Sequence, residues 1–336
     1  MTHQLEQLEP ALVNDDKPVS EQREIAGKSP LRIAFDRLRK DPVAVVAFVI
    51  VVFFMLIALF APVIAKAFGV STDTVLACSV VDCANSTQMP LVGPPLHSFT
   101  MSHPFGMAPQ TGNDNLAYWL YGARTSLYIA TMAAVISTLI GIVLGLLAGY
   151  VGGFVDRIIG FSIDLFLSVP FLLGALSIAP ILGDRFATDP HALGVAQFWA
   201  LIGILSFFGW MYLARLIRGE VLSLREREYV EAARQIGMPT SRILFRELLP
   251  NLVAPIVVAF SLGLPAYVAA EAGLSYLGIG VTGRPSWGQT IDAATPYYNQ
   301  YPLFLWEPVI GIVLLVLALN LLGDAIRDAL DPKTRR

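Results

Sequence analysis

Long apolar runs separated by polar stretches organise this sequence. Residues 43–65 carry no charge, and runs of similar length recur along the rest of the chain. About 20 apolar residues cross the hydrocarbon core of a bilayer, so each run is long enough to form a transmembrane helix. The pattern predicts an all-α membrane protein with six spans, at residues 43–65, 125–150, 158–182, 192–214, 248–270 and 303–322.

The overall composition agrees with this prediction. Hydrophobic residues make up 55% of the 336 positions, and charged residues only 15%. A soluble domain of this length would carry about 25% charged residues. No small-residue cleavage site follows the first apolar run, so we expect that run to stay in place as an anchor.

Basic residues predict the orientation of the spans. If both termini lie in the cytosol, 19 of the 23 Lys and Arg residues are cytoplasmic. The other four fall on the opposite side: Lys66, Arg124, Arg185 and Arg284. Cytoplasmic loops of membrane proteins are enriched in Lys and Arg, so the bias predicts a chain with both ends in the cytosol.

The chain divides into five parts on this basis. A disordered cytoplasmic tail is expected at 1–30, a basic juxtamembrane helix with the first span at 31–65, and an extracytoplasmic loop at 66–122. A membrane core follows at 123–324, interrupted by a cytoplasmic loop at 218–250, and a cytoplasmic tail closes the chain at 325–336. The juxtamembrane helix is amphipathic, which is typical of a helix lying on the membrane surface.

The cytoplasmic loop has the pattern of two helices joined by a turn. Residues 228–236 are good helix formers, Gly237 fits a left-handed cap, and Pro239 cannot continue the helix. Thr240 or Ser241 can cap a second helix at 242–249, which Pro250 would end. A solvated hairpin between two spans explains this pattern as well as a docking element does. The adjacent Ala232 and Ala233 would give the first helix a narrow waist for a partner protein.

A small number of polar residues in or near the spans are candidates for function. Asp164 lies inside the third apolar run, where a carboxylate costs about 2.5–3.5 kcal/mol on insertion scales. It could line a water-filled path, or pair with Arg157 or another subunit, and we favour a structural or gate-lining role over a proton relay. Ser168 and Pro170 are the other path candidates, because prolines in this span indicate a bent helix beside a cavity.

Two cysteines, Cys78 and Cys83, lie in the extracytoplasmic loop, where a disulfide is one reading and two free thiols the other. Their spacing to His97 and His103 matches no compact zinc site, so no metal site is expected.

Catalytic signatures are missing from the sequence. Gly27-Lys28-Ser29 has Gln22 where a phosphate-binding loop needs glycine, so the chain does not hydrolyse ATP by that motif. The string at 273–275 is not followed by the glycine of a nucleophile elbow. We therefore expect a non-enzymatic protein whose energy comes from a partner or a gradient.

The cytoplasmic loop resembles the EAA loop of ABC importer permeases. Glu231-Ala232-Ala233, then Gly237, then Leu249-Pro250 match that motif, and Glu247 departs from it where an aliphatic residue is usual. Four further segments resemble C-type permeases of oligopeptide and dipeptide importers: 29–65, 103–127, 271–288 and 319–332. Within the second of these, residues 107–115 replace the family's usual acidic stretch.

The resemblance implies a fold, a function and a set of partners. The fold is a type I permease core of five helices preceded by one extra span, in the inner membrane of a bacterium. The function is that of the membrane subunit of a peptide importer, with Glu231, Ala232, Ala233, Arg234, Gly237, Leu249 and Pro250 coupling it to ATPases. Partners would be a second homologous permease, two ATP-binding subunits that use ATP and Mg²⁺, an extracytoplasmic peptide-binding protein and the lipid bilayer, and not nucleic acid.

Other readings stay open at this point. Nickel and glutathione importers share this type of permease. A stand-alone secondary transporter or channel is the alternative class, although the sequence shows neither an internal repeat nor a selectivity-filter string.

Overall fold

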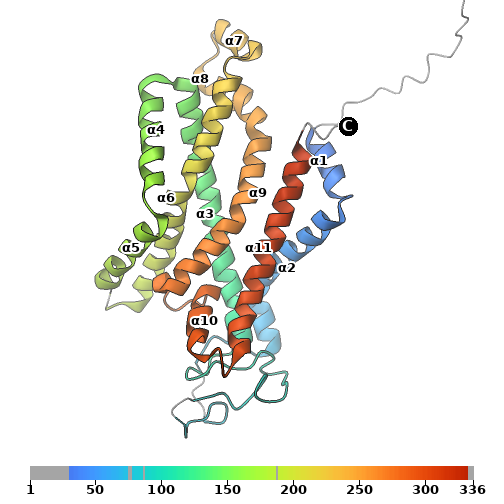
Figure 1. Ribbon diagram of the computed structural model, residues 1–336, viewed down its shortest axis with the longest axis vertical. Coiled ribbons are helices and arrows are strands. Elements are labelled where there is room, and N and C mark those ends of the chain that lie inside the picture. Colours follow the sequence, from blue (N-terminus) through green and yellow to red (C-terminus); the bar gives the residue numbers. More distant parts are fainter. Residues whose placement is uncertain (1–29, 75–77, 86–87, 187, 332–336) are drawn as a thin grey trace, which may run out of the picture.

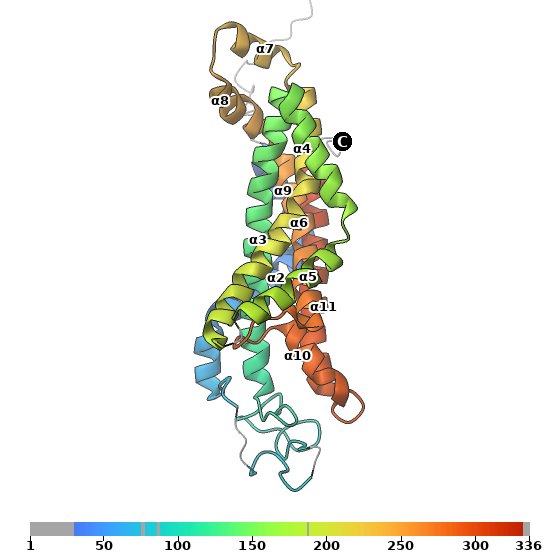
Figure 2. The same cartoon turned by 90° about the vertical axis from the view of Figure 1, so that its left-hand side faces the viewer.

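The computed structural model describes residues 30–74, 78–85, 88–186 and 188–331. The expectations for most of the N-terminal tail and for residues 332–336 lie outside these ranges. The described chain is built from helices, and its only β-pairing consists of isolated bridges, all of which lie within the segment from residue 81 to residue 114. Figures 1 and 2 show the long helices running roughly along one axis, as expected for a bundle that crosses a membrane.

Five helices of the described chain are long and apolar enough to span a bilayer. They are α2 (Pro42–Phe68), α3 (Asn115–Val151), α6 (Pro190–Leu224), α9 (Leu249–Leu274) and α11 (Pro302–Leu330). α9 is the central part of a continuous helical stretch, Thr240–Ile279. A bent pair, α4 (Gly153–Ser168) and α5 (Phe171–Arg185), makes a sixth span if it is counted as one. The all-α class and the six-span pattern agree with the sequence prediction.

The third predicted span is broken rather than continuous. α4 and α5 meet at an angle of 82°. Val169, between them, has an extended backbone with φ −83° and ψ 122°. The residue before a proline avoids helical angles, so Pro170 accounts for the break. Pro180, which the sequence also marked as a bend, lies inside α5.

Glycines on α3 bring α6 into close contact. A Cβ atom at Gly145 would lie 2.7 Å from Cβ of Ile217, and one at Gly149 would lie 2.7 Å from Cβ of Val221. Gly141 stands 3.0 Å from Leu213 by the same measure. Gly141 and Gly145 stand four positions apart in the sequence, a spacing that predicts a close helix approach. The structure confirms this approach and extends it by one turn, to Gly149.

The two ends of the bundle are built differently. At one end lie α1 (Pro30–Leu38), α7 (Glu228–Gln235), α8 (Thr240–Arg242) and the C-terminal end of α11, which are all segments predicted to be cytoplasmic (Figure 1). The predicted surface helix α1 packs against α11, with Ala34 buried and Phe35 exposed. At the other end lie residues 70–114 and α10 (Trp287–Ala294) (Figures 1 and 2).

Polar contacts fix residues 70–114 to the bundle. His103 Nδ1 lies 2.7 Å from Asp114 Oδ2, and Asp114 also caps α3 by accepting from the Ala117 N–H. The buried Tyr301 hydroxyl donates to the Pro94 carbonyl at 2.8 Å, and burial raises the pKa of this phenol, which keeps the donor proton in place. Cys78 and Cys83 are joined by a disulfide, with their Cα atoms 5.3 Å apart.

Candidate functional site

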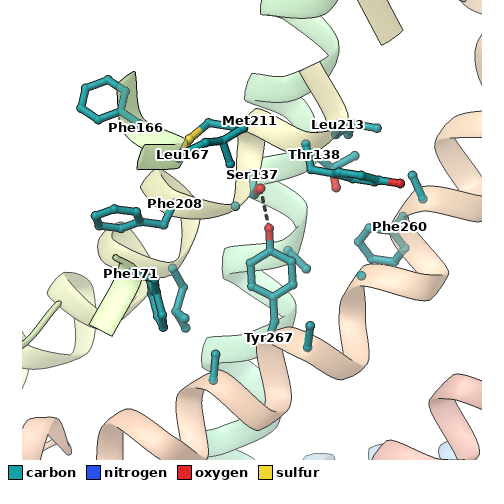
Figure 3. A pocket seen from close by; sticks show the side chains of 18 of the residues that line it. Ser137, Thr138, Phe166, Leu167, Phe171, Phe208, Met211, Leu213, Phe260 and Tyr267 are labelled. Atoms are coloured by element: carbon teal, nitrogen blue, oxygen red, sulfur yellow. Dashed lines mark hydrogen bonds between the residues drawn. The ribbon is translucent and has the colours of Figure 1, made fainter. Parts of the chain in front are cut away.

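A cavity of about 520 Å³ lies between three of the long helices and the bent pair α4–α5. α3, α6 and α9 form its walls, and the break between α4 and α5 reaches into it (Figure 3). The proline-induced break therefore has a positional effect, because it places Leu167, Pro170 and Phe171 at the cavity wall.

The lining of the cavity is apolar with a few hydroxyl groups. Phe171 and Phe208 pack edge to face, with ring centroids 5.6 Å apart. The Tyr267 hydroxyl on α9 donates to Ser137 Oγ on α3 at 2.5 Å, and Figure 3 shows this bond crossing between the two helices. None of the described lining residues carries a charge. Such a surface can accept apolar and aromatic groups of a ligand, and can satisfy only a few of its polar atoms.

The three path residues proposed from sequence have different positions. Pro170 lines the cavity. Ser168 does not, and its hydroxyl donates to the Leu165 carbonyl at 2.6 Å within its own helix. Asp164 forms an ion pair with Arg215 of α6, so the suggested pairing with Arg157 is wrong. Arg157 is close to Asp164 only in sequence, whereas packing of α4 on α6 brings Arg215 to it.

A second ion pair joins the same two helices nearer the end that carries α7. Arg218 donates to both carboxylate oxygens of Asp156, with Nη2 to Oδ2 at 2.8 Å. Bidentate pairs of this type fix geometry as well as charge. Arg215 and Arg218, both counted among the cytoplasmic basic residues of the sequence, thus also hold α4 against α6.

The cytoplasmic loop begins with α7 and the turn predicted for it. Gly237 has φ +77°, in the left-handed region that favours glycine. The Met238 N–H donates to the Ala233 carbonyl at 3.1 Å, which closes the end of the helix. The predicted first helix and its glycine cap are confirmed.

The second helix of the loop differs from the prediction. The helix starts at Thr240 with no side-chain cap, so the cap expected from Thr240 or Ser241 is wrong. It also does not end at Leu249: a π-helical stretch, Ile243–Leu248, runs directly into α9. Leu249 N–H bonds to the Leu244 carbonyl, five residues back, and this wider turn lets the chain pass Pro250 without stopping.

Neighbouring alanines in α7 face opposite ways. Ala233 is buried, whereas Ala232 is exposed. Successive helix positions do not share a face, so the narrow waist expected from both alanines is wrong. Ala233 and Val230 instead pack into one cluster with Val221 of α6 and Ile243 and Leu248 of the π-helical stretch. α7 is therefore seated on the ends of two spanning helices.

The outward face of the loop carries apolar side chains that sequence analysis missed. Ile236 is 78% exposed and Phe245 is 63% exposed. Their signal was visible, since both are apolar residues in an otherwise charged segment. Arg234 lies 5.5 Å above the ring of Tyr150, and Arg225 donates to the Gly149 carbonyl, so the loop is also held to the end of α3.

Five to six apolar spans packed around a cavity define a multi-pass membrane protein. Residues 141–336 match the family described as "binding-protein-dependent transport system inner membrane component", and residues 29–73 match the "N-terminal TM domain of oligopeptide transport permease C". The chain belongs to the first of these families, and it is a non-catalytic, multi-pass permease subunit of an ABC importer. Such a subunit works with ATPase and substrate-binding components.

Curated relatives cover nearly the whole chain. The dipeptide transport system permease protein DppC of Alkalihalophilus pseudofirmus is 32% identical over 308 residues, which is 91% of each chain. The oligopeptide transport system permease protein OppC of Bacillus subtilis is 33% identical over 301 residues, 89% of this chain and 88% of the relative. A chain of the inward-facing MetNI methionine ABC transporter aligns with 62% of this chain and 94% of its own length, at 21% identity and a TM-score of 0.48.

Proposed function

We propose that this chain is one of two homologous membrane subunits of an ATP-driven peptide importer, and that its cytoplasmic loop couples it to the ATPases. The partners are a second permease, two ATP-binding subunits that use ATP and Mg²⁺, and an extracytoplasmic peptide-binding protein. The relatives named as dipeptide and oligopeptide permeases support the peptide assignment, because they align over about nine-tenths of the chain.

The seating of α7 supports the coupling role most directly. Its inner side, through Val230 and Ala233, packs against the ends of α6 and α9. Its outer side exposes Glu231, Ala232 and Arg234 to a partner. A force applied to the outer side is transmitted to two helices that line the cavity.

The matched motif residues then have separate tasks. Gly237 gives the turn that sets the direction of α7. Leu249 and Pro250 lie where the π-helical stretch passes into α9, so they join the loop to a cavity wall. When ATP closes the partner ATPases, movement of the loop shifts α6 and α9 and changes the side to which the cavity opens.

The cavity suits the passage of peptide side chains. Aromatic and aliphatic walls accept varied apolar side chains without demanding one shape, and hydroxyls of Ser137, Thr138 and Tyr212 offer hydrogen bonds to peptide groups. This chain supplies one wall of the path, and the second permease would supply the other.

Purification with partners followed by transport measurement tests the proposal. Tagged protein would be isolated from its native membrane in mild detergent, its companions identified by mass spectrometry, and the complex placed in liposomes. We expect a second permease and ATPases in near-stoichiometric amounts, and ATP-dependent uptake of di- and oligopeptides once binding protein is added.

The same liposomes separate the remaining alternatives. Uptake of nickel or glutathione in place of peptides would move the chain to a different importer of the same type. Recovery of a homo-oligomer without ATPase, with ATP-independent uptake, would overturn the importer proposal and favour a stand-alone transporter.

A further inference from the structure

The Asp164–Arg215 ion pair forms the next layer below the cavity on its coupling-loop side. Arg215 follows the cavity residues Met211 and Tyr212 by four and three positions on α6. Asp164 precedes the cavity residue Leu167 by three positions on α4. Residues three or four apart share a helix face, so the pair continues the cavity wall by one turn. Figure 3 shows Leu167 and Met211 side by side, where the two helices approach.

The Asp164–Arg215 pair is the more exposed of the two ion pairs and is called the outer pair. The Asp156–Arg218 pair is called the inner pair. The Arg215 and Asp164 side chains are 54% and 73% exposed, whereas Arg218 and Asp156 are 36% and 23% exposed. Only the inner pair is bidentate. The more exposed, single-bond pair is the easier of the two to exchange for another anion, while the bidentate inner pair keeps α4 on α6.

Asp164 is not left isolated when the outer pair opens. It also interacts electrostatically with Arg218, so it keeps a basic neighbour if Arg215 turns away. The arrangement thus leaves one guanidinium, at the edge of an uncharged cavity, available to another anion.

A peptide that passes the edge of the cavity needs a positively charged group there. Its side chains match the cavity lining, but its terminal carboxylate finds no cation among the described lining residues. Moving a carboxylate out of water without a partner is costly. A guanidinium presents a fork of N–H donors that fits a carboxylate bidentately.

Building on the proposed function, we propose that Arg215 binds the C-terminal carboxylate of the passing peptide, with Asp164 as the counter-ion that holds it between transport events. Arg215 then acts as a selectivity residue that favours peptides with a free carboxyl terminus. The ion pair re-forms when the peptide leaves toward the cytosol.

Uptake of two matched probes tests this role. The complete importer in liposomes would be given labelled alanyl-phenylalanine or its C-terminal amide, with the same binding protein throughout. Arg215→Gln should lower uptake of the free acid by at least about tenfold, the usual scale for losing a hydrogen bond to a charged group. Uptake of the amide should stay within about twofold of the unsubstituted importer, because it has no carboxylate to lose. Preferences of the binding protein cancel, because each probe is compared between variants.

Two further variants guard against a purely structural explanation. Arg218→Gln removes the inner pair and should lower uptake of both probes to the same degree. Asp164→Asn keeps Arg215 and should retain the preference for the free acid. Equal losses of acid and amide in Arg215→Gln, or no loss of either, would overturn the assignment to Arg215. If the unsubstituted importer takes up neither probe, the proposed function itself fails.

Discussion

The two ends of this protein hold their non-spanning segments by different means. At the coupling end, α7 and the π-helical stretch are seated by apolar packing on α6 and α9, and they leave Ile236 and Phe245 exposed. At the opposite end, the described parts of residues 70–114 are held to the bundle by polar contacts around Tyr301 and Asp114, and a disulfide closes a short loop within them.

This difference suits two kinds of work. Apolar packing is non-directional, so a packed element can slide or tilt with the helices beneath it and stay attached. Buried hydrogen bonds have strict geometry and are costly to break, so they hold a segment in one place. We therefore infer that the packing of the coupling end suits the transmission of movement, and that the contacts of the opposite end keep its shape.

The largest expected effect is on the turn of the coupling end. Gly237→Val forces a β-branched residue into φ +77°, which costs at least about 1–2 kcal/mol and redirects α7. Peptide uptake should fall about tenfold or more while protein remains in the membrane and ATP hydrolysis persists. Gly219→Val is the matched control, because a Cβ at Gly219 on α6 meets nothing within 4 Å. Normal uptake by Gly237→Val would refute the role of the cap.

The packing beneath α7 should come next in size. Val230→Ala removes buried methyl groups from the cluster that seats the helix, at a cost of about 2 kcal/mol. We expect a several-fold lower ratio of peptide transported to ATP hydrolysed. Gln235→Ala, which alters an exposed residue of α7 outside the packed cluster, serves as the comparison. An unchanged ratio in Val230→Ala would show that α7 does not need a firm seat.

At the opposite end, Tyr301→Phe should loosen the fixed segment. The change removes the hydrogen bond to Pro94 and leaves a partly buried carbonyl without this donor, at about 1–3 kcal/mol. Limited proteolysis should cut residues 70–114 faster, while uptake at saturating binding protein changes little. If uptake fell as sharply as in Gly237→Val, the division of labour between the two ends would be incorrect.

The smallest effect is expected from the disulfide. Cys78 and Cys83 are five positions apart, so the bridge closes a short loop and contributes about 2 kcal/mol to local order. Cys78→Ser with Cys83→Ser should raise proteolysis of the segment less than Tyr301→Phe does. A loss of assembled importer in the double variant would instead place the bridge among the essential supports.

Sequence patterns predicted features that depend on neighbouring residues. The spans, the glycine cap of α7 and the close approach of α3 to α6 follow from apolar length and from glycine spacing. Features that depend on which helices pack together could not be predicted from the sequence. Arg215 as the partner of Asp164, and the burial of Ala233 rather than Ala232, needed the packing of α4 and α7 on the bundle.

Predictions from proline were confirmed at one position and wrong at another, for the same reason. At Pro170 the chain breaks, as expected, whereas at Pro250 a π-helical stretch absorbs the disturbance and the helix continues. The local rule states only what proline removes, and the surrounding packing decides whether the helix bends, breaks or widens by one residue.

The loop continues into α9 as one uninterrupted helix, so α9 can transmit movement along its axis. From Ile243 to Tyr267 the chain runs about 36 Å at 1.5 Å per residue, and no loop intervenes. We therefore expect a displacement at the cytosolic end to reach the Tyr267–Ser137 bond in the cavity, because no flexible linker lies between them to absorb it. Pro255 and Pro265 interrupt the hydrogen bonding of this helix, so we expect any bending during movement to concentrate at these two positions.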